Sequence, residues 1–200
     1  QVKSFLLMHG VPQPAGLAHW SGAAVEALRG LALSPELRMC LDVLLDELEH
    51  ARGQVERVTR HLEGLARADR HREAVAAMRT VPGVGPITAM TYRLEMPEPS
   101  RFAHDGQVAR FTGLAPLVRQ SGQTRRESGL LRCSGARLRT ALVEAAWRWV
   151  ACDESARATY RRLVANTGSG KKAIVAVARR LGILLWRLSV RGGPYRSSAA

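Results

Sequence analysis

Nine apolar residues in heptad spacing commit the stretch from residue 37 to 65 to one long helix. The spacing alternates between four and three residues, every one of the nine positions is apolar, and most residues between them are charged. The nine are Leu37, Leu41, Leu44, Leu48, Ala51, Val55, Val58, Leu62 and Leu65. A two-position stripe kept over four heptads favours a coiled coil over a helix lying on a globular core. At 1.5 Å per residue, this helix would be roughly 45 Å long.

The stripe needs a partner, which is either a second copy of the chain or another helix of the same chain. A narrow stripe of this length favours self-association, so we expect a homo-oligomer, and only Gly53 weakens the pattern. The start of the helix is well marked, because Ser34 can act as N-cap and Pro35 suits the first helical position.

Shorter helices are expected on both sides, which makes the fold class all-α. Before the heptads, we expect helices over 2–8 and from Ser21, as a possible N-cap, to about Leu31. After them, we expect helices over 73–79, 102–114, 138–151, 157–164 and 171–188. Trp147 and Trp149 are expected in the core. We assign 1–72 to linker and oligomerisation, 73–196 to a second helical domain and 197–200 to a disordered tail.

A turn that joins two of these helices has the pattern of a helix-hairpin-helix, over about residues 78–95. The segment Val81 to Ala89 reads V-P-G-V-G-P-I-T-A. Gly83 and Gly85 would leave backbone N–H groups free at a helix N-terminus, where a phosphate can bind without sequence preference. An ordinary turn between two helices is the alternative.

Charge divides the chain into a neutral front and a cationic back. The whole chain has net charge +13, but residues 110–200 hold eighteen basic and four acidic residues, while residues 1–109 carry a net charge of −1. This asymmetry predicts a scaffold followed by a nucleic-acid-binding part. The most apolar run, 173–188, contains Arg179 and Arg180, so it does not predict a membrane span.

The densest cationic segment is the stretch 113–139, in which Glu127 is the single acid. Glycine, serine and threonine weaken a helix here, and the alternation of a strand is nearly absent, so we expect an irregular loop that opens into a helix near residue 137. Three serines in it are each followed by glycine, namely Ser121, Ser128 and Ser134. The candidate nucleic-acid-binding residues are its six arginines, Arg119, Arg125, Arg126, Arg132, Arg137 and Arg139, together with Gly83, Gly85, Lys171 and Lys172.

Several other site types are excluded. The segment 167–172, T-G-S-G-K-K, is not a nucleotide-binding loop, because Lys172 replaces the required Ser or Thr and a helix precedes it; its two lysines suit phosphate contacts. The six histidines are scattered and no Ser-His-Asp arrangement can be argued. Three cysteines at unrelated spacings suggest neither zinc nor disulfides, which fits a reducing cytoplasm.

In this order, the segments resemble the DEDD-type insertion-sequence transposases, which are related to pilin-gene invertases and associated with bridge-RNA-guided recombination. The resemblance covers nearly the whole chain. Its most specific parts are V-P-G-V-G-P-I-T-A, R-F-A-H-D-G-Q-V-A-R-F-T-G-L-A-P, R-Q-S-G, L-V-E-A-A-W and G-K-K-A-I-V-A-V-A-R-R-L.

The resemblance implies a serine nucleophile for DNA strand cleavage and rejoining, and the R-x-S-G context places it on Ser121. It also implies an N-terminal RuvC-like domain with four metal-binding acids and Mg²⁺, which these 200 residues are expected to lack; without it, we expect the chain to bind nucleic acid but not to cut it. The implied partners are duplex DNA, a structured guide RNA and further copies of the chain, in a bacterial, nucleoid-associated, cytoplasmic protein with no membrane contact.

One departure from the family pattern lies after the serine. The run Gly135 to Arg139 is one residue shorter than usual, and Leu131, Arg132 and Cys133 replace the usual Ser/Thr-Lys residues. The alternative function is therefore a non-catalytic, dimerising, nucleic-acid-binding remnant of a transposase. A helix-hairpin-helix repair factor would explain the glycine turn but neither the heptads nor the R-Q-S-G segment.

Overall fold

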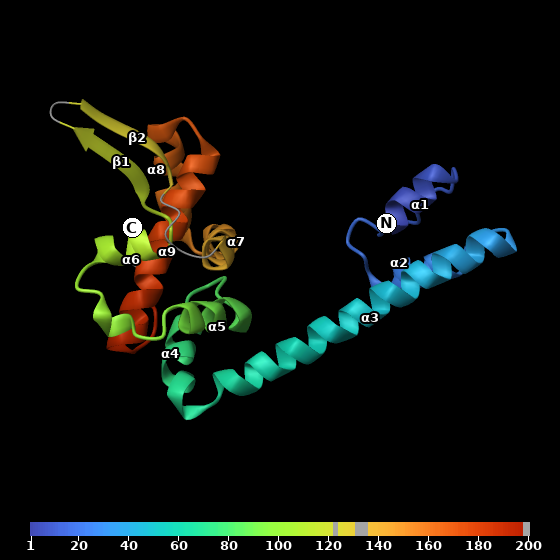
Figure 1. Ribbon diagram of the computed structural model, residues 1–200, viewed down its shortest axis with the longest axis horizontal. Helices are drawn as coiled ribbons and strands as arrows, with labels where there is room; N and C mark the ends of the chain where they lie inside the picture. The colour runs from blue at the N-terminus through green and yellow to red at the C-terminus, as the bar shows by residue number, and fades with distance from the viewer. Residues whose placement is uncertain (122–123, 131–135, 198–200) are drawn as a thin grey trace. The chain divides into compact units, whose positions relative to one another are not determined.

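The computed structural model describes residues 1–121, 124–130 and 136–197, and these form two compact units, Gln1–Arg60 and His61–Ala200 (Figure 1). The described chain is mainly α-helical, which confirms the expected fold class. Unit 1 contains α1 (Val2–Met8), α2 (Gly22–Arg29) and most of α3 (Pro35–Ala66), which runs on past the end of the unit. The elements of unit 2 are α4 (Asp69–Arg79), α5 (Pro86–Glu95), η1 (Pro99–Arg101), α6 (Asp105–Phe111), β1 (Pro116–Ser121), β2 (Thr124–Leu130), α7 (Ala136–Cys152), α8 (Glu154–Thr167) and α9 (Gly170–Arg191).

The helix starts of unit 1 follow their sequence signals. Ser21 is the N-cap of α2, and its hydroxyl accepts a hydrogen bond from the Ala24 amide at 3.2 Å. Ser34 accepts from the Leu37 amide at 3.4 Å, directly before Pro35 opens α3. Both caps satisfy backbone N–H groups that have no acceptor within their own helix.

The core of unit 1 is small and uses only the first part of α3. Its buried residues are Val2, Leu6, Leu17, Ala24, Val25, Leu28, Leu41 and Leu45. Leu45 is fully buried although it lies outside the heptad stripe, while Leu44 and Leu48 are only partly buried. This part of α3 therefore presents a broad apolar face to α1 and α2, as a helix on a globular core does.

The second part of α3 is uncovered in the described chain. Val55 is 65% exposed, Val58 57% and Leu65 44%, although all three continue the heptad stripe. The expected long helix is thus present as 32 residues, but the stripe is buried within the chain only at its beginning. Coiled-coil pairing stays a prediction for residues 51–65.

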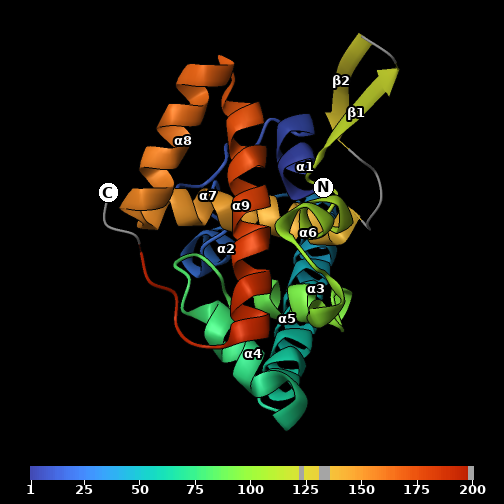
Figure 2. The same cartoon turned by 90° about the vertical axis from the view of Figure 1, so that its left-hand side faces the viewer.

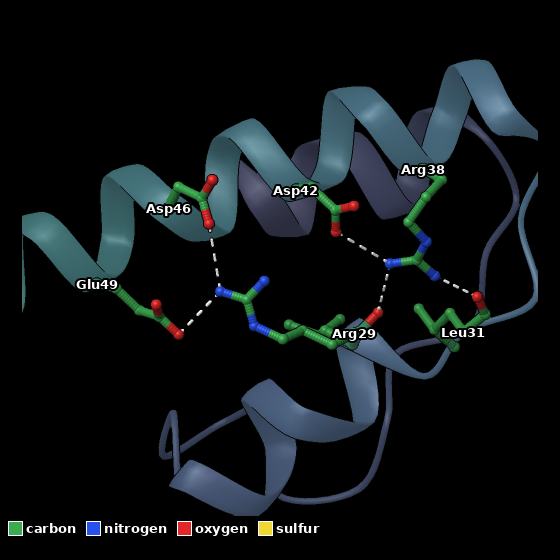
Figure 3. Close-up of polar contacts among 7 residues, drawn as sticks. Arg29, Leu31, Arg38, Asp42, Asp46 and Glu49 are labelled. Atoms are coloured by element: carbon green, nitrogen blue, oxygen red, sulfur yellow. Dashed lines mark hydrogen bonds and ion pairs between the residues drawn. The ribbon is translucent and has the colours of Figure 1, made fainter.

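Two arginines fasten α2 and the connection after it to α3 (Figure 3). Arg29 reaches Asp46 at 3.3 Å and Glu49 at 2.9 Å. Arg38 pairs with Asp42 at 3.3 Å and donates to the carbonyl oxygens of Leu28 and Leu31. Because Arg38 satisfies the carbonyls where α2 ends, it fixes the point at which the chain turns back towards α3.

The centre of unit 2 is α9, which packs against α4, α6, α7 and α8 (Figure 2). Its inward face is apolar and includes several small residues. The buried residues are Ala173, Ile174, Val177, Ala178, Leu181, Gly182, Leu185 and Leu188. The hydroxyl of buried Tyr92 on α5 donates to the Gly182 carbonyl at 2.6 Å. A Cβ at Gly182 would lie 3.3 Å from Cδ1 of Leu142, a tight contact that the Leu142 side chain would have to shift slightly to accept. None of the helices in the described ranges is long and apolar enough to cross a bilayer.

The two tryptophans of α7 have different environments. Trp149 is buried, as expected, whereas Trp147 is 47% exposed and packs edge-on against Tyr160 at 5.5 Å between ring centroids. The prediction of a core position is therefore wrong for Trp147. It lies two residues from Trp149 and so on a different side of the same helix.

Residues 116–121 and 124–130 form the two strands of an antiparallel β-hairpin, so the prediction of an irregular loop there is wrong. The hairpin extends away from the helices of unit 2 (Figures 1 and 2). Alternation of apolar and polar residues marks a strand with one buried face, and a ribbon that projects from the body has no such face. The missed signal is the connection itself: glycine followed by one residue, between Ser121 and Thr124, is typical of a two-residue hairpin turn.

Candidate nucleic-acid interface

The hairpin gathers the first arginines of the cationic segment into a short ribbon. Arg119 in β1 pairs with Arg126 in β2, and Gln120 pairs with Arg125. Ser121, the candidate nucleophile, is the last residue of β1 and pairs with Thr124. The predicted arginines at 119, 125 and 126 thus lie within a few residues of the candidate serine in the same two-stranded element.

A bulge lies near the foot of the hairpin. Pro116 pairs with Leu130 and Val118 with Glu127, so β2 has one residue more than β1 over this step. Gly129 takes a φ of +55°, a left-handed conformation that other residues adopt at a cost. Such a bulge usually bends a two-stranded ribbon and increases its twist.

The foot of the hairpin borders a cationic groove on α9. A cavity of about 450 Å³ is lined by Pro116, Gly129 and Leu130 on one side and by Lys171, Lys172, Val175, Ala176 and Arg179 on the other. The two predicted lysines are therefore next to the ribbon that carries Ser121. Sequence reasoning missed Arg179, although its distance of seven residues from Lys172 places both on one face of α9.

Cations occupy the first turns of two helices, where the helix dipole disfavours them. Lys171 and Lys172 lie in the first turn of α9, and Arg137 and Arg139 in the first turn of α7; neither turn contains an acid. Anions are the groups that a helix N-terminus stabilises. Positive side chains added to a positive helix end therefore indicate a surface for an external anion, such as a nucleic-acid phosphate.

The two glycines of the α4–α5 turn have different surroundings. Gly83 takes a φ of +87°, and a Cβ there would lie 2.7 Å from the Trp149 backbone nitrogen and 2.8 Å from the Arg148 Cβ. Gly85 is the exposed N-cap of α5, and a Cβ there would meet open space. Gly83 thus packs the turn against α7, while Gly85 lies where a phosphate could approach. The helix-hairpin-helix function stays a prediction.

Arg93, a cation near this turn, is engaged by backbone carbonyls. Arg93 donates to the carbonyl oxygens of Pro97 at 2.6 Å and of Met96 and Arg70 at 3.4 Å. His71 is buried beside it, and burial, together with the positive charges of Arg70 and Arg93, lowers the pKa of its imidazole. The interior of this region therefore disfavours additional positive charge.

The structure thus brings part of the predicted site together. Ser121, Arg119, Arg125 and Arg126 share the hairpin, and the lysines border its foot. Gly83 and Gly85 belong to the α4–α5 turn, and Arg132 lies outside the described residues. Among the described residues, no three His, Cys, Asp or Glu side chains are grouped so that they could hold a metal ion.

Residues 75–161 match the sequence model of the transposase IS116/IS110/IS902 family. This range runs from the middle of α4 into α8 and contains the glycine turn, the hairpin and Ser121. The match therefore covers the elements that carry most of the candidate site.

Individual relatives extend the similarity towards both ends of the chain. A putative transposase of Sinorhizobium fredii, y4rJ, is 29% identical over 94% of this chain and 51% of its own length. A second one, y4qE, is 32% identical over 58% of this chain and 36% of its own length. The transposase for insertion sequence element IS1111A of Coxiella burnetii is 24% identical over 96% of this chain and 55% of its own length. The chain thus spans about half or less of the length of these relatives.

Proposed function

We propose that this chain, whose residues 75–161 match the sequence model of the IS116/IS110/IS902 transposase family, acts in DNA transposition by binding DNA through the hairpin and the groove at its foot. The observation that carries the proposal is the placement of Lys171, Lys172 and Arg179 beside the arginine-rich ribbon that ends in Ser121. Unit 2 holds 24 basic and 10 acidic residues, a charge that suits a polyanion.

Duplex DNA is the form that this geometry suits. The major groove admits a two-stranded β-ribbon, and phosphate contacts from lysine and arginine then fix the position of the protein on the duplex. In this arrangement the hairpin enters the groove and the cations at the start of α9 contact the flanking phosphates. A structured guide RNA is a second proposed partner of the same cationic surface, because an A-form helix also offers rows of phosphates.

We assign the chemical step to Ser121. Its Oγ would attack a phosphodiester, forming a phosphoserine bond while the P–O bond to one deoxyribose breaks and that oxygen takes up a proton. The attack of the released 3′ or 5′ hydroxyl of another strand on this bond would rejoin the DNA. The arginines of the ribbon would stabilise the negative charge on the phosphoryl oxygens. A Mg²⁺ bound to acids outside these 200 residues would supply further charge stabilisation and help remove the serine proton.

Assembly of several copies is proposed through the second part of α3. The exposed residues Val55, Val58 and Leu65 continue the heptad stripe. A stripe of this kind is buried when two such helices pair. Pairing would bring two cationic units to the two DNA ends that a recombination reaction must handle together.

The test of DNA binding compares the wild type with Lys171→Gln/Lys172→Gln across a salt series, on duplex DNA and on a structured RNA. We expect steep salt dependence for the wild type and a slope smaller by about two for the double variant, one for each lost phosphate contact. Arg161→Gln/Arg162→Gln, which removes two exposed charges of α8, is the matched control and should change the slope less. Weak binding of both nucleic acids by the wild type would overturn the proposal.

The chemical role needs a separate comparison in a cleavage-competent assembly that contains this chain. Ser121→Ala should abolish the covalent protein–DNA adduct and leave DNA binding unchanged, whereas Ser128→Ala and Ser134→Ala should retain the adduct. An adduct that survives Ser121→Ala would support the alternative function, in which the chain binds DNA and dimerises but has no nucleophile at this position.

A further inference from the structure

Unit 2 contains a second cationic cleft, on a different side of α9 from the hairpin groove. It has a volume of about 370 Å³ and lies among α9, the start of α6, α7, the first turns of α8 and the chain after α9. Figure 2 shows α8 and α6 on either side of α9. Three arginines line this cleft, Arg180, Arg187 and Arg196.

The charge of the cleft is not neutralised from within. Arg187 pairs with Asp105 at 2.5 Å, and Asp105 is the single acid among the lining residues. Neither Arg180 nor Arg196 has an ion-pair or hydrogen-bond partner in residues 1–121, 124–130 and 136–197. Two guanidinium groups are thus available at the cleft for an anion with oxygen acceptors, such as a phosphate.

The remaining wall is aromatic and apolar. Tyr195 and Trp149 meet edge to face at 6.1 Å between ring centroids, and Ile183 and Leu184 of α9 complete the surface. The buried indole of Trp149 lies beside the Tyr195 hydroxyl, so the two aromatic side chains form one continuous part of the wall.

The wall is held in place before any ligand binds. The Tyr195 amide donates to Oγ1 of Thr80 at 2.7 Å, and its hydroxyl donates to Oδ2 of Asp153 at 3.2 Å. Asp153 is itself fixed, because its Oδ1 caps α8 by accepting from the Ala156 amide at 2.8 Å. Burial, together with the nearby carboxylate, raises the pKa of the Tyr195 phenol, so the hydroxyl stays protonated and keeps this bond.

We propose that this cleft binds one unpaired nucleotide, with its phosphate on Arg180 and Arg196 and its base against Tyr195, Ile183 and Leu184. A mononucleotide fits a pocket of a few hundred Å³, whereas a base-paired duplex is too wide to enter. Aromatic and arginine side chains that flank an unstacked base are the usual means by which proteins hold single-stranded nucleic acid.

This inference rests on the proposed function, since it takes nucleic acid as the partner of unit 2. It adds a preference for an unpaired nucleotide, which the hairpin groove does not supply. Arg179 lines the hairpin groove and its neighbour Arg180 lines the cleft, so the two cationic surfaces adjoin along α9. A strand bound at the hairpin could therefore place one extrahelical nucleotide in the cleft.

The experiment measures the affinity of the 200-residue chain for a plain DNA duplex and for the same duplex with one unpaired central adenine. The wild type should bind the second duplex about tenfold more tightly, as the stacking of one base predicts. Arg180→Gln/Arg196→Gln should remove this preference and keep most of the binding to the plain duplex. Arg161→Gln/Arg162→Gln, which removes two charges of α8 that do not line the cleft, should keep the preference.

A second readout follows the base itself, with 2-aminopurine at the unpaired position. Its fluorescence should be quenched on binding to the wild type and to Tyr195→Phe, which keeps the ring, and not on binding to Tyr195→Leu. Equal affinity of the wild type for the two duplexes, or a preference that survives Arg180→Gln/Arg196→Gln, overturns the inference. Weak binding of the plain duplex would instead count against the proposed function. If Tyr195→Leu does not fold, the affinities of Arg180→Gln/Arg196→Gln for the two duplexes test the inference.

Discussion

The two units of this chain leave different kinds of surface uncovered. Unit 1 holds six basic and seven acidic residues, and its arginines Arg29 and Arg38 are used to fasten α2 to α3. Its exposed apolar residues include Val55 and Val58 on the second part of α3, and also Leu7, Met8, Met39 and Val43. Unit 2 closes a larger apolar core around α9 and leaves cations at helix starts and in two grooves. The surface that each unit leaves uncovered suits the partner proposed for it: a second copy of the chain for unit 1 and nucleic acid for unit 2.

The largest effect is expected where the core of unit 1 depends on one side chain. Leu45→Ala should destabilise unit 1 by about 2 to 5 kcal/mol, because it leaves a cavity in a core of few residues. Calorimetry should show a lower transition temperature for unit 1 and an unchanged transition for unit 2. Arg57→Ala, at an exposed position of the same helix outside the heptad stripe, should change neither. A joint shift of both transitions with Leu45→Ala would show that the units do not unfold separately.

In unit 2, the turn before α5 should be nearly as sensitive. Gly83→Ala adds a Cβ 2.7 Å from a backbone nitrogen and requires a left-handed φ, so we expect a loss of about 2 to 4 kcal/mol in the free energy of unfolding. Gly85→Ala is the matched control, since its Cβ meets open space. Urea unfolding measures both. Equal effects at the two glycines would contradict the close packing of this turn on α7.

Self-association tests the apolar surface of unit 1. Val55→Glu/Val58→Glu should weaken it at least tenfold, about 1.4 kcal/mol, because two charges would enter the proposed helix pair. Sedimentation equilibrium gives the dissociation constant. Thr59→Glu, a half-buried residue outside the stripe, serves as a control for added charge. An unchanged monomer–oligomer equilibrium for the double valine variant would break the assignment of a protein partner to this surface.

Removal of a charged side chain that stabilises unit 1 should have a smaller effect on stability. Arg38→Ala should cost about 1 kcal/mol of stability, since it removes hydrogen bonds to two carbonyls at the end of α2. Arg57→Ala, an exposed arginine in the uncovered part of α3, should cost little. Thermal unfolding of the two variants makes the comparison. Lys172→Gln in unit 2 should also leave stability nearly unchanged, because that charge faces solvent.

The smallest expected effect is the pH response of His71. Its folded-state pKa lies below the ordinary value of about 6.5, so the unfolded chain binds the proton more readily. Stability is therefore fully present above about pH 6.5 and decreases as the pH falls through the range below it. His71→Leu should flatten this decrease, measured by thermal unfolding between pH 5 and 8. An unchanged slope would show that other groups cause it.

Local signals predicted the helices well. Ser21 and the Ser34-Pro35 pair marked helix starts that the structure contains, and the heptad stripe predicted the length of α3. These signals work because capping and helix periodicity involve residues that are close in sequence. The stripe could not show that α1 and α2 cover only its beginning, because that depends on contacts between distant residues.

The candidate site was predicted less completely. The cationic segment and its serine were found from composition and family resemblance, but the hairpin was missed because its strands lack alternation. In the sequence Arg179 only interrupts an apolar run, whereas its position on α9 places it beside the lysines. The cleft around Tyr195 depends on a short segment folding back onto Thr80 and Asp153, and no local pattern indicates such a return.

The projecting hairpin has a thermodynamic consequence. A two-stranded ribbon without a core beneath it is marginally stable in water, because two strands bury little apolar area. In the proposed DNA complex, part of the free energy of binding would then be used to order the ribbon, and the measured affinity would include that conformational entropy. Binding should therefore show a larger negative enthalpy and a larger unfavourable entropy than docking of a rigid surface. A disulfide across the foot of the ribbon would raise the affinity without adding a single contact to DNA.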